Sequence, residues 1–480
     1  MTTTSTLAAD SARRARDATL IAASLGFGVI QLDVTVVNVA VKQIGDAFGG
    51  GVSELQWVIS AYTLMFASLI LTAGALSDRF GARRVFTAGI VTFVLASMAC
   101  ALAPSIAILI GARGPGRGAA MLGSCSLALL NHTFREPAEH ARAVGRWAAG
   151  ASAALSGGPV VGGVLIAILG WRSIFFINLP IGVLGLWLTR TYTQETPRSE
   201  HRGLDLRGQI AAVIALSTFA AALIEGGALG FANLGVLAGF ATAAAAAAAF
   251  LTIESGSCRP MLPLSLFRRP AFLSPTLIGM LVNVCFYGLI FLFSLLFQSQ
   301  HRMSALQTGL AFLPMTAAIM AANLLSGRLS EHIGAARTVL TGVVIMLAGC
   351  TGLLWTNHAT SYGGILAQQL LLGGGLGLLV PAITRTLLGS VELARSGIAS
   401  GTLTTMRQTG SMLGVALFGT LIAAHNRFFA GLHTALLVSI AALLLSATLT
   451  PILTPRQRCR ERVLPNDANR TARTSEPNRA

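Results

Sequence analysis

The sequence predicts an all-α protein that crosses a membrane many times. Hydrophobic residues make up 54% of the 480 residues and charged residues only 11%, which is typical of polytopic membrane proteins. Apolar stretches of about 20 residues, the length that spans a bilayer as a helix, alternate with short polar loops. These stretches are too continuous for the alternating pattern of a membrane β-barrel, so we expect helices throughout.

Basic residues are distributed unevenly between the loops. The net charge of +16 could suggest a nucleic-acid partner, but the arginines concentrate on the termini and on alternate loops. The opposite loops carry only Lys42, Arg172, Arg302 and Arg427. Because cytoplasmic loops are enriched in Lys and Arg, we expect both termini in the cytoplasm, a location in the plasma membrane and no nucleic-acid binding. The basic set is Arg13, Arg14, Arg16, Arg79, Arg83, Arg84, Arg135, Arg142, Arg198, Arg202, Arg268, Arg269, Arg337, Arg395, Arg456, Arg458, Arg460 and Arg462.

One segment of the chain occurs twice. Residues 74–89 align without gaps to residues 327–342, and the copies share glycines, a Leu-Ser pair, an acid, an alanine and an arginine. The copies follow the second and the tenth predicted spans, so they lie on the same side of the membrane. This is the pattern of a parallel repeat of six spans, with two further spans between the halves.

The repeat and the apolar stretches predict how the whole chain is organised. Fourteen spans are expected, near residues 18–41, 55–76, 85–103, 105–131, 141–168, 172–192, 208–228, 231–253, 271–297, 304–326, 338–356, 362–388, 397–424 and 431–450. The segments are a cytoplasmic arm (1–17), a six-helix half (18–192), a loop (193–207), two inserted helices (208–253), a loop (254–270), a second six-helix half (271–450) and a disordered basic tail (451–480).

One carboxylate lies inside the first predicted span. An ionised aspartate near the bilayer centre, as Asp33 is, costs about 2.5–3.5 kcal/mol to insert. Loss of hydration favours the protonated acid, so Asp33 is a candidate for proton transfer; the alternative is a structural ion pair or an interhelical hydrogen bond. At about 100° per residue, Gln31, Thr35 and Asn38 share a different face of the helix. The first span is therefore expected to be surrounded by protein.

Several short motifs, in their order and spacing, resemble one family. They are residues 32–40 in the first span, 74–84 in the next loop, 157–163 in the fifth span, 171–182, the acid Glu225 before Gly226, 263–270 and 407–410. These motifs resemble the major facilitator superfamily, and specifically its fourteen-span drug:proton antiporter branch, over nearly the whole membrane region. The resemblance implies a secondary transporter that exchanges its substrate for protons.

The resemblance implies roles for particular residues. Asp33 and Arg113 would form the proton-coupling pair, in which a carboxylate that gains and loses a proton lies beside a permanent cation. The conformational-switch motif would comprise Gly74, Asp78, Arg79, Gly81 and Arg83. The antiporter motif of the fifth span would comprise Gly158, Pro159, Gly162 and Gly163. The alternatives are an ordinary solvated loop for the first motif and plain helix packing for the second.

The fourth span departs from the family pattern. The family carries an arginine, two residues, a glutamine and a glycine there, whereas this chain has Arg113, Pro115 and Arg117 without the glutamine. On one continuous helix the two arginines would lie one turn apart and repel each other, and the proline would interrupt the backbone hydrogen bonds between them. Either the site has been remodelled or the recorded sequence carries a local error.

Polar and aromatic residues within the spans are candidates for the substrate pathway. Glu225 could contact cationic substrates, and Phe286 and Tyr287 belong to aromatic stripes that could receive a flat lipophilic molecule, although such stripes are more often core. Arg407, near mid-depth in the thirteenth span, needs a partner or a water-filled cavity. The complete set is Gln31, Thr35, Asn38, Glu225, Phe286, Tyr287 and Arg407.

These observations predict a monomeric, proton-coupled exporter of lipophilic drugs or antibiotics. The alternative within transport is an exporter dedicated to one metabolite or antibiotic. A membrane-embedded enzyme is disfavoured because the chain has no metalloprotease motif, nucleophile elbow or phosphate-binding loop. The six cysteines are widely spaced, so neither a metal site nor a cofactor is expected. A passive channel is disfavoured by the repeat of two halves.

Overall fold

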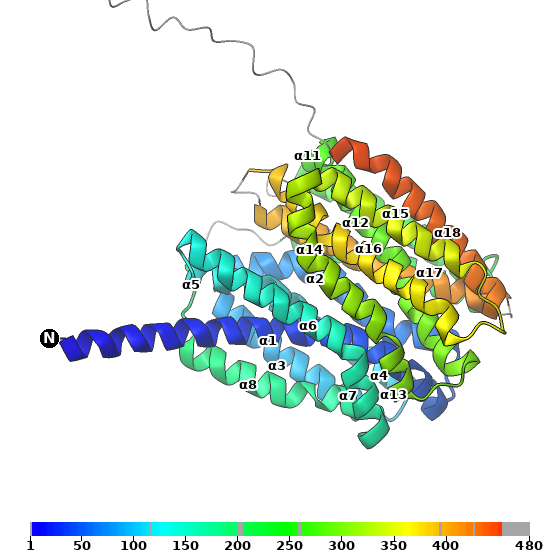
Figure 1. Cartoon of the computed structure of the whole chain (residues 1–480), viewed down its shortest axis with the longest axis horizontal. Coiled ribbons are helices and arrows are strands. Elements are labelled where there is room, and N and C mark those ends of the chain that lie inside the picture. The colour runs from blue at the N-terminus through cyan, green and yellow to red at the C-terminus, as the bar shows by residue number, and fades with distance from the viewer. Residues whose placement is uncertain are drawn as a thin grey trace, which may run out of the picture.

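The protein is a bundle of long helices (Figure 1). The structure, a computed structural model, describes residues 2–114, 117–198, 205–257, 262, 264–392, 396–425 and 428–453. No strand occurs in these residues, and twelve of their helices are long and apolar enough to cross a membrane. The predicted all-α membrane fold is confirmed.

The first half of the chain begins with one very long helix. The predicted arm and the first span are continuous, because α1 runs from Thr2 to Phe48 and ends where Gly49 adopts a positive φ of 67°. The helices of this half are α1 (Thr2–Phe48), α2 (Val52–Phe80), α3 (Ala82–Ala101), α4 (Ile106–Arg113), α5 (Arg117–Thr133), α6 (Pro137–Leu169), α7 (Ser173–Phe176) and α8 (Asn178–Tyr192).

Two helices separate this half from the rest, namely α9 (Leu206–Leu229) and α10 (Leu234–Gly256). The remaining helices are α11 (Leu264–Phe267), α12 (Pro270–Leu295), the π-helical turn η1 (Leu296–Gln300), α13 (Ala305–Ala311), α14 (Leu313–Ile333), α15 (Ala335–Leu353), α16 (Tyr362–Gly389), α17 (Ser396–His425), α18 (Phe428–Leu449) and the 3₁₀ turn η3 (Thr450–Leu453). The tail from residue 454 onward, together with Arg202, Arg395, Cys258 and Cys459, lies outside the described residues.

The sequence repeat has a counterpart in backbone conformation. Gly81 separates α2 from α3 with a φ of 95°, and its repeat equivalent Gly334 separates α14 from α15 with a φ of 87°. Each glycine donates its backbone N–H to the carbonyl of the equivalent serine, Ser77 or Ser330, four residues earlier. Side chains rarely adopt this conformation, so the repeated glycines mark the same tight turn in both copies.

The first and second halves meet along two seams. In one seam α2 packs against α17, and in the other α6 packs against α13 and α14. Helix α9 contacts both α2 and α17, and α10 packs mainly on α9. The helices flanking the seams therefore belong to different ends of the sequence.

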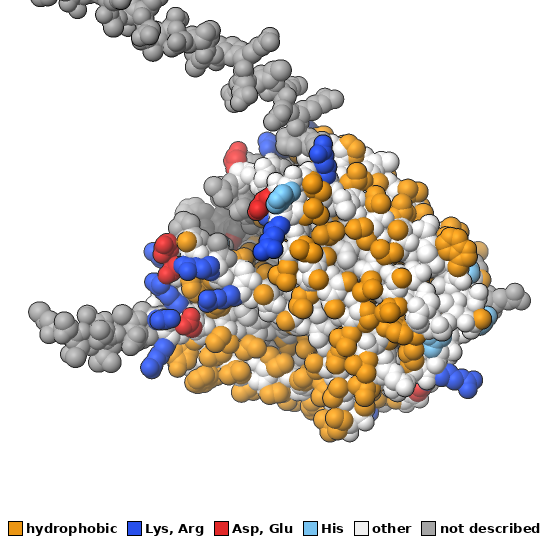
Figure 2. All heavy atoms as spheres, in the orientation of Figure 1, with side chains coloured by type: hydrophobic (Ala, Val, Ile, Leu, Met, Phe, Trp, Pro, Cys, Tyr) orange, Lys and Arg blue, Asp and Glu red, His pale blue; other side chains and the backbone are white. Residues whose placement is uncertain are grey.

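The surface matches a protein held in a membrane. Figure 2 shows hydrophobic side chains spread over most of the visible face, with charged side chains gathered mainly along one side. Leu184, Leu234 and Leu324 are among the large apolar residues that are exposed at the surface of the molecule. We call the end of the bundle that carries Arg79, Arg83, Arg84 and Arg190 the basic end.

Candidate functional site

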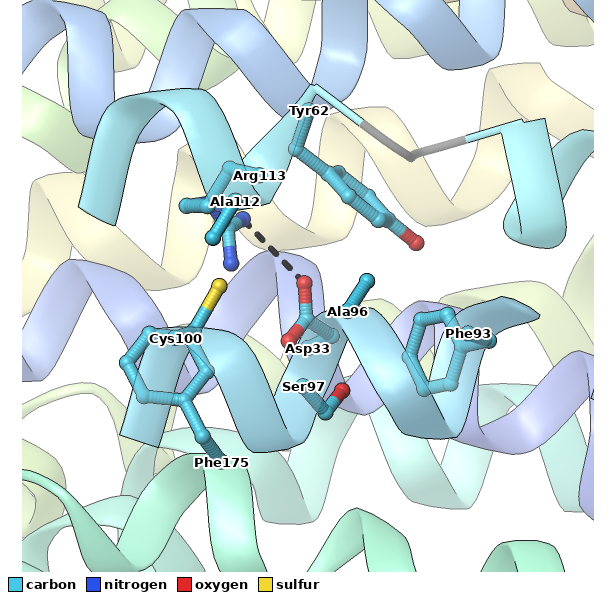
Figure 3. Close-up of a pocket in the computed structure, with 9 residues that line it drawn as sticks. All are labelled: Asp33, Tyr62, Phe93, Ala96, Ser97, Cys100, Ala112, Arg113 and Phe175. Atoms are coloured by element: carbon cyan, nitrogen blue, oxygen red, sulfur yellow. Dashed lines mark ion pairs between the residues drawn. The ribbon is translucent and has the colours of Figure 1, made fainter. Parts of the chain in front are cut away.

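The centre of the candidate site is a buried ion pair between α1 and α4. An Nη atom of Arg113 lies 3.1 Å from a carboxylate oxygen of Asp33, and the two side chains are 3% and 4% exposed. Figure 3 shows the two groups pointing toward each other from separate helices. The structure thus brings together the two residues for which the sequence predicts proton coupling.

Arg113 is the last residue of the short helix α4. Ser105 caps the beginning of α4 by accepting a hydrogen bond from the backbone N–H of Ile108, and the helix ends at Arg113. A cation is favourable at a helix C-terminus, where the dipole is negative.

The structure changes how the unusual fourth span is interpreted. The predicted span is divided between α4, which ends at Arg113, and α5, which begins at Arg117. The prediction that the two arginines share one continuous helix, one turn apart, is therefore wrong. Pro115 and the side chain of Arg117 lie outside the described residues.

Aromatic rings enclose the guanidinium of Arg113. Its carbon lies 4.8 Å from the ring centre of Tyr62 and 5.7 Å from that of Phe175, within the range of cation–π attraction. Both rings are buried. The sequence analysis assigned no role to either residue. Tyr62, in α2, lies outside every motif, whereas Phe175, in α7, belongs to the motif at residues 171–182, which was the one signal available.

The two charged groups of the ion pair lie close together, but some of their polar atoms are not hydrogen-bonded. Asp33 Oδ2 and Arg113 Nε are buried and have no hydrogen-bond partner among the residues that the structure describes. A cavity of about 20 Å³ adjoins the pair and is lined by Ser97, Cys100 and the aromatic rings. This volume is enough for about one water molecule.

The other polar face of α1 lies at the junction of the two halves. Thr35 and Asn38 line a second cavity of about 20 Å³ together with Pro159, Phe286 and Phe312. Asn38 donates from its amide nitrogen to the carbonyl of Val34 at 2.7 Å, while its amide oxygen is buried without a partner. Three sequence-predicted motifs therefore converge here. Gln31 is only partly buried and does not line this cavity.

The glycines of the fifth-span motif allow α6 to pack tightly on two neighbours. A Cβ at Gly158 would overlap Thr35 of α1, and one at Gly163 would lie 2.8 Å from the carbonyl oxygen of Ala305 in α13. In the opposite direction, a Cβ at Gly309 of α13 would overlap the carbonyl oxygen of Pro159. This motif thus joins the first helix to the seam between the halves.

The switch-motif loop is held at the basic end by an acid outside the motif. The Glu195 carboxylate accepts a hydrogen bond from the backbone N–H of Arg83 at 3.0 Å and lies 3.6 Å from the Nε of Arg84. A Cβ at Gly81 would overlap this carboxylate. Arg79 stacks over Phe80, while Gly74 has open space around it. Sequence patterns gave no signal for Glu195.

The remaining candidates occupy two different environments. Glu225 accepts hydrogen bonds from the indole N–H of Trp57 at 3.1 Å and from the Ser53 hydroxyl at 3.4 Å, so it fastens α9 to α2. Arg407 lies in α17, where its Nε is buried and has no hydrogen-bond partner within the described part of the chain. Tyr287 packs against the apolar clusters of both halves.

A buried ion pair within apolar helices, together with a separate cavity where two helical halves meet, is typical of membrane transporters. The Major Facilitator Superfamily profile matches residues 23–415, and the chain belongs to this family. The predicted superfamily is confirmed, and the protein is a transporter and not an enzyme.

Named relatives are resistance proteins. The chain is 38% identical over 407 residues to Multidrug resistance protein Stp of Mycobacterium tuberculosis, covering 85% of this chain and 76% of that protein. It is 36% identical over 406 residues to the Methylenomycin A resistance protein of Streptomyces coelicolor, covering 84% and 85%. A solved bacterial homolog of the human lysosomal transporter Spinster, in an inward-facing and unoccupied conformation, has a TM-score of 0.65 at 16% identity, covering 92% and 97%.

Proposed function

We propose that this protein exports lipophilic drugs or antibiotics in exchange for protons, by alternating access. The observation that carries the proposal is the buried Asp33–Arg113 ion pair beside a water-sized cavity. The names of its relatives, which are resistance proteins, support the substrate class. The proposal includes membership of the fourteen-span drug:proton antiporter branch, with α9 and α10 as the two inserted spans.

Proton binding begins at Asp33. When Asp33 is ionised, it compensates the charge of Arg113, which arginine cannot lose by deprotonation. When Asp33 takes up a proton, this attraction is lost and the guanidinium retains only the faces of Tyr62 and Phe175. The two protonation states therefore favour different positions of α4 relative to α1.

Helix α1 connects the proton site to the substrate site. Asp33 faces α4, whereas Thr35 and Asn38 face the cavity between the halves. The cavity of about 20 Å³ is far smaller than a drug site, which typically has about 300–1,000 Å³. The halves must therefore separate at this seam before a substrate can enter.

The glycine contacts of α6 provide the surface on which this separation occurs. At Gly163 and Gly309 the backbones of α6 and α13 lie in direct contact. Such a surface can part and close again with little side-chain rearrangement. Ser294 of α12 also donates a hydrogen bond across to the carbonyl of Asn38 in α1.

The proposed orientation follows from the arginines. Placing the basic end in the cytoplasm, in agreement with the positive-inside rule, makes a cytoplasmic location of both termini part of the proposal. The proposed organisation is an arm (1–17), two six-helix halves (18–192 and 271–450), the inserted pair (208–253) and a basic tail (451–480). A monomer contains the complete ion pair and both cavities.

Efflux into everted membrane vesicles tests the proposal. Vesicles with the protein should accumulate a fluorescent lipophilic dye when an acid-inside proton gradient is imposed, and a protonophore should abolish the accumulation. Vesicles without the protein are the control. Accumulation that persists after the gradient is dissipated would contradict proton coupling.

A panel of chemically unrelated compounds distinguishes the proposed function from its alternative. Movement of several compounds supports a drug exporter. Movement of one compound alone supports a dedicated exporter of a single metabolite or antibiotic.

A further inference from the structure

We propose that Arg407 and Tyr287 form a subsite for the anionic group of a substrate, so that lipophilic carboxylates are one substrate class of this protein. The inference deepens the proposed export function and rests on it. It starts from a cation that the helix bundle leaves uncompensated.

Arg407 has no counter-ion within the described part of the chain. No carboxylate forms an ion pair with it there, and its buried Nε has no hydrogen-bond partner. The residue as a whole is partly exposed. A permanent cation at membrane depth is costly without a partner or water.

The helices around Arg407 cannot supply a carboxylate at the same depth. α17 and its neighbours α12, α16 and α18 contain no aspartate or glutamate. The neighbouring helix α2 has acids only near its two ends, at Glu54 and Asp78, and α9 has only Glu225. Glu225 is engaged by Trp57 and Ser53.

The charge of Arg407 differs in this respect from that of Arg113. The Arg113 charge is compensated by Asp33 at 3.1 Å. Asp33 and Arg113 neutralise each other, so of these three intramembrane charges the positive charge of Arg407 on α17 remains. An anionic ligand would neutralise this charge through charge-assisted hydrogen bonds. Guanidinium groups form such bonds to carboxylates in pairs.

The surroundings of Arg407 suit an aromatic or lipophilic anion. Its aliphatic part packs on Gly279 of α12, where a Cβ would lie 3.4 Å from the arginine Cγ. Tyr287, two turns further along α12, is within electrostatic range of the guanidinium and packs against both halves. The ring of Phe286, 5.4 Å from that of Tyr287, lines the cavity at the seam. A carboxylate on Arg407 would thus leave its apolar body beside these rings.

Depth excludes a lipid headgroup as the ligand. Arg407 lies eleven residues after the first residue of α17, or about 17 Å along the helix axis at about 1.5 Å per residue. Headgroup phosphates lie outside the hydrocarbon layer, which is about 30 Å thick. The ligand must therefore carry its own charge into the bundle.

Binding of a matched pair of probes tests the inference. Pyrenebutyrate and its methyl ester share the aromatic body and differ in the charge. At pH 7.5, fluorescence anisotropy with the purified full-length protein should show that the acid binds roughly 10- to 100-fold more tightly than the ester. Arg407→Gln should abolish this preference with ester binding retained, and Arg407→Lys should restore part of it.

The control is Arg385→Gln, which removes an exposed cation from α16 in the same half and should leave the preference unchanged. Equal affinities of the wild-type protein for acid and ester, or equal weakening of both by Arg407→Gln, would overturn the inference. Retained ester binding shows that the variant is folded.

Efflux assays separate this inference from the proposed function. Arg407-dependent binding of the acid without protonophore-sensitive efflux of any compound would refute the export function and leave the subsite standing. Proton-driven efflux of a neutral or cationic dye, with no preference for the acid, would refute the subsite alone.

Discussion

Replacing Asp33 with asparagine removes the charge of the proton-binding group while preserving its shape. Arg113 then remains charged and buried, with its side chain 3% exposed, beside a neutral amide. Removing one partner of a buried ion pair costs about 3–5 kcal/mol. The asparagine oxygen can still accept one hydrogen bond from the guanidinium, so we expect the lower end, about 3 kcal/mol.

This free energy predicts the size of the folding defect. At about 1.4 kcal/mol for each factor of ten, 3 kcal/mol shifts the folding equilibrium roughly 100-fold. We expect Asp33→Asn to abolish concentrative, proton-driven efflux, because the amide cannot take up a proton. Exchange of labelled for unlabelled substrate, which needs no net proton movement, should persist. Dye accumulation and lumenal pH are measured together in everted vesicles.

A paired variant separates coupling from folding. Asp33→Leu combined with Arg113→Met removes both charges, so most of the lost stability should return. Coupling should stay absent because no titratable group remains. Concentrative efflux by Asp33→Asn that a protonophore still abolishes would refute the role given to Asp33.

Two further predictions concern glycines. Gly158→Val should abolish transport with the protein still in the membrane, because the valine side chain would overlap α1. Gly157→Val should remain active, because the space within 4 Å of its Cβ position is open. Vesicle efflux normalised to protein amount compares the two variants, and equal activities would contradict the packing role. Gly81→Ala should lower the free energy of unfolding by about 1–3 kcal/mol, because alanine would be strained at a φ of 95°. Gly74→Ala should leave the stability unchanged. Thermal unfolding in detergent measures both variants, and equal midpoints would refute the predicted strain at position 81.

The ion pair illustrates how much of a functional site can be predicted from sequence patterns. The depth of Asp33 in an apolar span predicts that it needs a partner, and the family resemblance indicates Arg113. Tyr62 and Phe175, which enclose the guanidinium, lie 51 residues before and 62 residues after Arg113 in the sequence, and no short-range pattern relates them. Contacts of this kind depend on how the helices cross.

The fourth predicted span shows where an average of hydropathy over many residues is misleading. Hydropathy treats residues 105–131 as one stretch, because glycine and the neighbouring apolar residues keep the average high. The structure ends α4 at Arg113, the residue that pairs with Asp33 of α1. An average over some 20 residues is insensitive to such an interruption.

The sequence by itself determined the all-α membrane fold, the repeat and the two polar faces of the first helix. These properties depend on local composition and on the fixed geometry of the helix, which places successive side chains about 100° apart. Only the tertiary structure decided that Asp33 meets Arg113 within two aromatic rings, that Glu195 holds the switch-motif loop and that Arg407 has no carboxylate partner in the described chain. Charges buried among helices find their partners across distant segments, so packing and not sequence spacing determines which of them are compensated.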